Sequence, residues 1–218
     1  MRRAFVLVVI GVAILAGCGS TAVTPNPGLT PAPPADGWSY MAWADPALEI
    51  ALPDGWTNGV PSGTTSPEAR ASFGPVQQRA VDWVDSLVAA GAARFWANGD
   101  IPTPLGPVGT GYVWVFVPRG DSTSLDAFAA AWMKRASDVG FSSITKTTVT
   151  LPAGVAAVVA FQGDYGAVWK FTQHDFLFVL PDGRGLVVQI GADASKVSND
   201  VLDQFASRVI ATLRPASP

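Results

Sequence analysis

The sequence predicts an α+β fold, in which a central antiparallel β-sheet is packed by helices on its faces. Three segments carry apolar residues at helical spacing. The segment 111–118, GYVWVFVP, is apolar on both faces, which is typical of an interior strand covered on both sides. From Ser143 to Gly191, extended runs alternate with turn residues, and connections this short join antiparallel neighbours. Together these observations favour a sheet sandwiched between helices.

The first extended segments are 38–43 and 48–52, both short and largely apolar. Asp45-Pro46 separates them, and PDGW at 53–56 ends the second, because Pro, Asp and Gly favour turns. We expect two short strands here.

Three helices are expected. The first covers 76–91. The second begins after the hydroxyl residues 122–124, which can cap its N-terminus, and ends before Gly140. The third begins near Ser198 and continues until Pro215 stops it. Their apolar stripes are residues 80, 81, 84, 87 and 88 in the first, Leu125, Phe128, Ala129 and Trp132 in the second, and Leu202, Phe205, Ala206, Val209 and Leu213 in the third.

The extended runs between the second and third helices are separated by Gly, Pro and Asp residues, which favour turns. We expect each run to form a strand. They are ITKTTVTL (144–151), VAAVVAF (155–161), AVWKFT (167–172), DFLFVL (175–180) and LVVQI (186–190).

The N-terminus has the pattern of an export signal. Arg2 and Arg3 precede an apolar segment, residues 4–15, that is too short to span roughly 30 Å of hydrocarbon. Leu15-Ala16-Gly17-Cys18 then matches the bacterial lipobox. That resemblance implies a signal peptide at 1–17 and a diacylglycerol thioether on Cys18, which would become the mature N-terminus. An ordinary secretory signal with an incidental cysteine is the alternative.

Residues 18–37 are expected to form a lipidated cysteine and a proline-rich tether, which leaves 38–215 as one domain. A proline-rich recognition ligand is the alternative for the tether. No second cysteine exists, so a disulfide or thiolate metal site is excluded. We therefore expect localisation at the cell membrane, lipid-anchored on the extracytoplasmic face, with the membrane as a partner through Cys18.

Composition argues against several functions. The net charge is −3, and the basic residues form no stripe that could follow nucleic-acid phosphates. His174 is the only histidine, and no Gly-x-Ser-x-Gly motif is present, so we expect no catalytic residues. We likewise expect no metal site and no cofactor. GPVGTG at 106–111 precedes a strand and so provides no helix N-terminus for a phosphate.

Eight tryptophans are available to line a binding site. Trp114, in the middle of a strand, and Trp132, on a helix stripe, are expected in the core. Trp38, Trp43 and Trp56 lie near turns and the tether, so they are the candidates for an exposed binding patch.

The order of these segments resembles a known family. ALPDGW (51–56), AARFWANGD (92–100), GYVWVFVP leading into SLDAFAAAW (124–132), TTVTLPAG (147–154) and DGRGLVVQIGAD (182–193) look like the PsbP-like lipoproteins of bacteria. The resemblance covers essentially the whole exported domain. It implies a PsbP-like α/β/α sandwich that serves as an accessory or binding domain, without established catalysis.

Three functional hypotheses follow. The first is a noncatalytic, lipid-anchored protein that presents its domain to an unidentified protein partner. The second is a binding module for a small apolar ligand, which a well-formed apolar cavity would favour. The third is a hydrolase, which a serine or aspartate within hydrogen-bond reach of His174, in a cleft, would favour.

Overall fold

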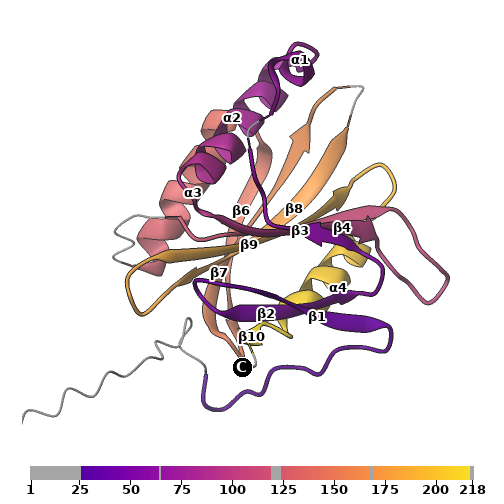
Figure 1. The fold of residues 1–218 in the computed structure, drawn as a ribbon, viewed down its shortest axis with the longest axis vertical. Coiled ribbons are helices and arrows are strands. Elements are labelled where there is room, and N and C mark those ends of the chain that lie inside the picture. The colour runs from indigo at the N-terminus through magenta and orange to yellow at the C-terminus, as the bar shows by residue number, and fades with distance from the viewer. Residues whose placement is uncertain (1–25, 64, 119–123, 167–168, 217–218) are drawn as a thin grey trace, which may run out of the picture.

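The structure, a computed structural model, describes residues 26–63, 65–118, 124–166 and 169–216 (Figure 1). Its larger sheet has seven antiparallel strands in the order β3-β4-β5-β9-β8-β7-β6, and its smaller sheet has the order β1-β2-β10. The strands are β1 (Trp38–Trp43), β2 (Leu48–Pro53), β3 (Thr57–Gly59), β4 (Ala93–Asp100), β5 (Thr110–Phe116), β6 (Ser142–Leu151), β7 (Gly154–Asp164), β8 (Lys170–Val179), β9 (Gly185–Asp193) and β10 (Arg214–Pro215). The helices are α1 (Pro67–Arg70), α2 (Pro75–Ala89), α3 (Leu125–Val139) and α4 (Asn199–Ile210).

The larger sheet separates two hydrophobic cores. On one side, α4 and the smaller sheet cover the face that carries Val113, Val188 and Ile190, which we call the closed face. On the other side, α2 and α3 lie over the face that carries Trp114 and Val187, which we call the open face. The predicted α+β fold, an antiparallel sheet with helices on both faces, is confirmed.

The three predicted helices are all present, and their caps explain where they begin and end. Ser124 accepts a hydrogen bond from the Ala127 N–H at the start of α3, and Gly140 ends that helix with a φ of 100°, a conformation that glycine adopts without a Cβ penalty. Ser198 caps α4 in the same way, by accepting from the Val201 N–H.

The third helix is shorter than expected. α4 ends at Ile210, and Leu213 is buried but not helical. The reason is the contact with the smaller sheet: Thr212 Oγ1 accepts a hydrogen bond from the Ala51 N–H at 2.8 Å, and Arg214 then pairs with Glu49 of β2. These contacts draw the chain into the sheet.

The strand predictions are largely confirmed. β5 lies between β4 and β9, so GYVWVFVP is an interior strand as expected. Two runs predicted separately, 167–172 and 175–180, instead contribute to one strand, β8, because Gln173 and His174 continue the pairing with β7 and β9. The strands β3, β4 and β10 and the short helix α1 were not predicted.

The segment before β1 lies against the domain. The Asn26 N–H donates to the Pro152 carbonyl at 3.0 Å, and the Ala32 N–H donates to the Ala211 carbonyl at 2.9 Å. Figure 1 shows this segment along the outer side of the smaller sheet. Part of the predicted tether is therefore docked on the domain.

Candidate functional site

A pocket of about 370 Å³, called here the aromatic pocket, lies between α2 and the open face. Rings form most of its walls, and amide and hydroxyl side chains form the remainder. The rings belong to Trp83, Tyr112, Trp114, Phe141, Tyr165, Trp169 and Phe171, and the polar side chains to Asn98, Thr110, Gln173 and Gln189.

Strand alternation places these side chains on one face. In β5, Val113 and Val115 point into the closed core, so Tyr112 and Trp114 point to the open face. Trp114 pairs with Gln189 of β9 across the sheet. The pairing register therefore sets a polar side chain directly beside a ring, at the floor of the pocket.

A glycine lets the tyrosine cross a whole strand. Tyr112 pairs with Gly191, and a Cβ at Gly191 would lie 2.2 Å from the phenol ring. Without that Cβ, Tyr112 extends over β9 and its hydroxyl donates to Gln173 Oε1 at 2.7 Å. Burial raises the pKa of Tyr112 well above its ordinary value, so the phenol remains a protonated donor.

A buried carboxyl group lies beside the floor, on the same face of the sheet. Asp175 is fully buried, and its oxygens accept from Gln173 Nε2 at 2.6 Å, Trp132 Nε1 at 2.6 Å and Gln189 Nε2 at 3.2 Å. Burial raises the pKa of Asp175 to about 7, although these three hydrogen bonds favour the ionised form and oppose the shift. The network fixes the orientation of both amides that line the pocket.

The rings of one wall support one another. Trp169 lies 5.1 Å from Phe171 and 5.6 Å from Tyr112 between ring centroids, and Tyr165 lies 6.0 Å from Trp169. These separations are typical of favourable aromatic pairs. The wall is therefore held in place by contacts within itself.

The aromatic pocket opens into a wider depression of about 860 Å³, which we call the outer groove. Its far wall is the segment between β3 and α1, including Val60, Pro61 and Thr65, and its near wall is α2. The two spaces share Ala80, Val84, Asn98, Tyr112, Trp114, Tyr165 and Trp169. A ligand in the pocket would therefore reach solvent through the outer groove.

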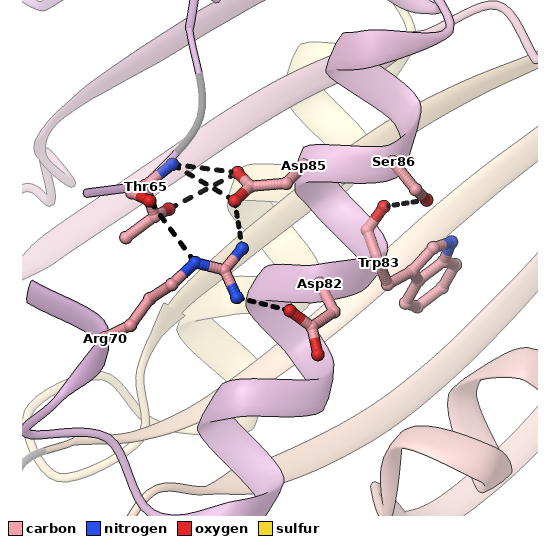
Figure 2. A network of polar contacts seen from close by, with 6 residues as sticks. All are labelled: Thr65, Arg70, Asp82, Trp83, Asp85 and Ser86. Carbon is pink, nitrogen blue, oxygen red and sulfur yellow. Dashed lines mark hydrogen bonds and ion pairs between the residues drawn. The ribbon is translucent and has the colours of Figure 1, made fainter. Parts of the chain in front are cut away.

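An ionic cluster ties the far wall to α2 (Figure 2). Arg70 forms ion pairs with Asp82 and Asp85, and its Nε donates to the Thr65 carbonyl at 3.2 Å. The Thr65 N–H and hydroxyl both donate to Asp85, at 3.1 Å and 3.3 Å. Figure 2 shows Arg70 between Thr65 and the helix, so we call this cluster the Arg70 clamp.

The binding patch expected from the sequence is not at the surface. Trp38, Trp43 and Trp56 are 8%, 6% and 6% exposed, and all three belong to the core of the closed face. Trp38 and Trp56 both contact the ring of Phe205 in α4, with centroids 5.7 Å and 5.4 Å apart. The expectation of an exposed patch is wrong because Phe205 of α4 packs against Trp38 and Trp56, and Phe95 of β4 stacks on Trp43 at a centroid distance of 5.9 Å.

Trp114 and Trp132 were both predicted to lie in the core, and only one of them does. Trp132 is buried as predicted. Trp114 is only partly buried and lines the aromatic pocket. The signal available in the sequence was the alternation of Tyr112 and Trp114 with valines, which assigns rings to one face of β5 and aliphatic side chains to the other.

His174 lies on the opposite face of β8 from Asp175. Its Nε2 is 3.2 Å from Asp203 Oδ1 of α4, and Asp203 is largely exposed. Burial lowers the pKa of His174, although Asp203 opposes that shift. His174 lines neither the aromatic pocket nor the outer groove. Asp203 is thus within hydrogen-bond reach of His174, but the pair lies in neither the aromatic pocket nor the outer groove, whereas the hydrolase hypothesis would require it to lie in a cleft.

The predicted lipid anchor is not part of the described structure. Cys18 and the signal peptide lie outside the described residues. Within the described ranges, no group of three or more His, Cys, Asp or Glu side chains could hold a metal ion, and no helix is both long and apolar enough to cross a membrane.

No protein-family model matches this chain, and no curated protein matches it.

Proposed function

We propose that the protein is a noncatalytic binding module that takes a small, largely apolar aromatic ligand in the aromatic pocket. The observation that carries this proposal is a cavity of about 370 Å³ with ring walls and an ordered polar floor. Small-molecule sites typically occupy 300–1,000 Å³ and combine apolar walls with a few fixed polar groups. Of the three hypotheses from the sequence, we therefore favour the small-ligand module.

The side chains of the aromatic pocket are held in place by contacts within the protein, and this supports the proposal. The wall rings contact one another, and Asp175 holds the amides of Gln173 and Gln189. Binding to an ordered site loses less side-chain entropy than binding to a mobile one, so more of the contact energy contributes to affinity.

We further propose that a lipid on Cys18 holds the module at the extracytoplasmic face of the cell membrane. The lipobox match and the resemblance to PsbP-like lipoproteins support this setting. Asn26 is already docked on the domain, and the chain from Cys18 to Asn26 extends at most roughly 30 Å. The anchored domain would therefore lie close to the bilayer.

Presentation to a protein partner is the second candidate. The outer groove favours it, because this groove is wide, at about 860 Å³, and Val60 on its rim is 71% exposed. A partner that covers Val60 would close the groove.

Filling the pocket tests the small-ligand proposal. Val84 lines both the aromatic pocket and the outer groove, whereas Val81, on the same helix, lines only the groove. Titration with the neutral fluorophore N-phenyl-1-naphthylamine should give saturable binding to the purified protein. We expect Val84→Trp to abolish it and the matched control Val81→Trp to retain it. Binding that survives in Val84→Trp would contradict the proposal.

The anchor is tested separately. We expect Cys18→Ser to abolish labelling of the protein by a clickable fatty acid and to release it from the membrane fraction, because two or three acyl chains are needed for stable attachment. Unchanged labelling of the variant would contradict the assignment.

A further inference from the structure

One hydrogen-bond acceptor at the floor of the aromatic pocket is available to a ligand. Gln189 is 7% exposed and lines the pocket, and its Nε2 donates to Asp175. Its Oε1 accepts no hydrogen bond from the described residues. In the part of the chain that the structure describes, the buried side-chain atoms without a partner are Trp43 Nε1 and Gln77 Oε1, so Gln189 Oε1 is accessible from the pocket. A ligand that places a donor there replaces solvent and gains one hydrogen bond relative to a ligand that does not.

The neighbouring acceptor is already occupied. Gln173 Oε1 accepts from the Tyr112 hydroxyl, and Gln173 Nε2 donates to Asp175. The carboxylate also fixes Gln189, because its oxygen attracts the amide N–H and so directs Oε1 away. Gln189 Oε1 is therefore the open acceptor of the floor.

The charge around the pocket favours a donor and disfavours an anion. None of the residues that line the aromatic pocket is Lys, Arg or His. The carboxyl group of Asp175 lies beside the floor, hydrogen-bonded to both lining amides. At low dielectric the ionised form of Asp175 would repel a ligand carboxylate, and no lining residue carries a positive charge to compensate.

We infer that the aromatic pocket takes a planar, uncharged aromatic molecule that carries an N–H or O–H group, and that this group donates to Gln189 Oε1. The inference rests on the proposed function and names the class of ligand for the same site. The ring of the ligand lies among the ring walls, and Gln189 selects for the donor.

Two pairs of probes test separately whether binding depends on a donor group of the ligand and on its charge. The isomers 3-methylindole and 1-methylindole have the same volume, but only the first has an N–H. Indole-3-acetamide and indole-3-acetate have nearly the same shape, but only the second is an anion. Isothermal titration of the purified full-length protein with each probe measures the four dissociation constants.

In the wild-type protein we expect 3-methylindole to bind about tenfold more tightly than 1-methylindole, which corresponds to one hydrogen bond. In Gln189→Leu that ratio should fall to near one. Asn98→Leu is the matched control, because Asn98 is another amide in the pocket lining, and there the tenfold ratio should remain. Indole-3-acetate should bind at least tenfold more weakly than the acetamide. If Gln189→Leu fails to fold, Gln189→Met serves instead, and each ratio is taken within one variant.

The outcomes are distinguishable. If both methylindoles bind equally in the wild-type protein and Val84→Trp blocks both, the donor inference is overturned and the proposed function stands. A tenfold ratio that survives in Gln189→Leu, or that is lost in Asn98→Leu, overturns the role of Gln189. Tighter binding of the acetate than of the acetamide overturns the exclusion of anions. If none of the four probes binds, both the inference and the small-ligand proposal fail.

Discussion

The two faces of the larger sheet are built by the same strands but are completed differently. On the closed face, α4 and the smaller sheet cover β5, β8 and β9 with aliphatic and aromatic side chains. On the open face, α3 covers part of the same strands, whereas α2 stands over the aromatic pocket. In β5 alone, Val113 is fully buried on one side, and Trp114 lines a cavity on the other.

The polar residues follow the same division. Asp175, Gln173 and Gln189 all point to the open face, and each hydrogen bond of the carboxyl group goes to a side chain on that face. A close-packed apolar core needs no such network, because dispersion and burial fix its side chains. The difference suggests that the closed face holds the fold together and that the open face is available for binding.

The largest expected effect is a core truncation on the closed face. Phe205 is 4% exposed and contacts the rings of Trp38 and Trp56. Phe205→Ala should lower the free energy of unfolding by about 3–5 kcal/mol, since it removes a buried ring and leaves a cavity. Urea denaturation measures the loss.

Trp169→Ala is the comparison on the open face, where the ring is only partly buried and borders a cavity. It should cost less than half as much stability and should weaken ligand binding. Equal losses in the two variants would contradict the division between the faces.

The parts of the fold that are encoded locally could be predicted. A hydroxyl at Ser124 or Ser198 and a glycine at position 140 fix the helix ends through hydrogen bonds within a few residues. The alternation in GYVWVFVP predicts an interior strand, because either face of such a strand must be covered. These signals act over short distances in the chain.

The site could not be predicted, because pairing between distant residues creates it. Gln189 stands among apolar residues in the sequence, and Asp175 follows the polar run 172–174. The two meet only because the β8 and β9 register places them opposite one another. Trp56 and Phe205 are similarly remote in the chain, so nothing near Trp56 shows that a helix covers it. Proximity to turns was therefore a poor guide to exposure.

The second prediction concerns pH and the open face. The pKa of Asp175 is raised to about 7 in the folded protein and is about 3.9 in an unfolded chain. Between these values the folded state binds the proton and the unfolded state does not, so the contribution of Asp175 to stability falls as pH rises from about 4 to 7. The full contribution is at most about 4 kcal/mol.

Asp175→Asn should remove this decrease in stability between pH 4 and 7. Urea denaturation at pH 4 to 8 measures the free energy of unfolding of both proteins. His174 acts in the opposite sense, because burial lowers its pKa, so the difference between wild type and Asp175→Asn isolates the carboxyl group. Asp138→Asn, which changes an exposed carboxylate on α3, is the control and should keep the wild-type profile. An unchanged profile in Asp175→Asn would show that the buried carboxyl group does not titrate in this range.

The smallest expected effect is local to the rim of the open face. The Arg70 clamp joins the segment before α1 to α2, and the Thr65 N–H is hydrogen-bonded to Asp85 within it. Arg70→Met keeps the length of the side chain but removes both ion pairs, so the Thr65 amide should open more often. We expect its hydrogen exchange to become about tenfold faster, with only a slight change in the urea midpoint.

Lys134→Met is the matched control, because it removes an exposed ion pair with Asp138 on α3, away from the outer groove. Exposed pairs of this kind contribute little, so exchange at Thr65 should not change. If Arg70→Met also leaves exchange at Thr65 unchanged, the clamp does not order the far wall of the groove. If exchange accelerates and the dissociation rate of a bound probe rises with it, the wall that the clamp holds controls exit from the aromatic pocket. The clamp has no contact with β2 in the part of the chain that the structure describes, so the same variant should leave exchange in β2 as it is in the wild-type protein.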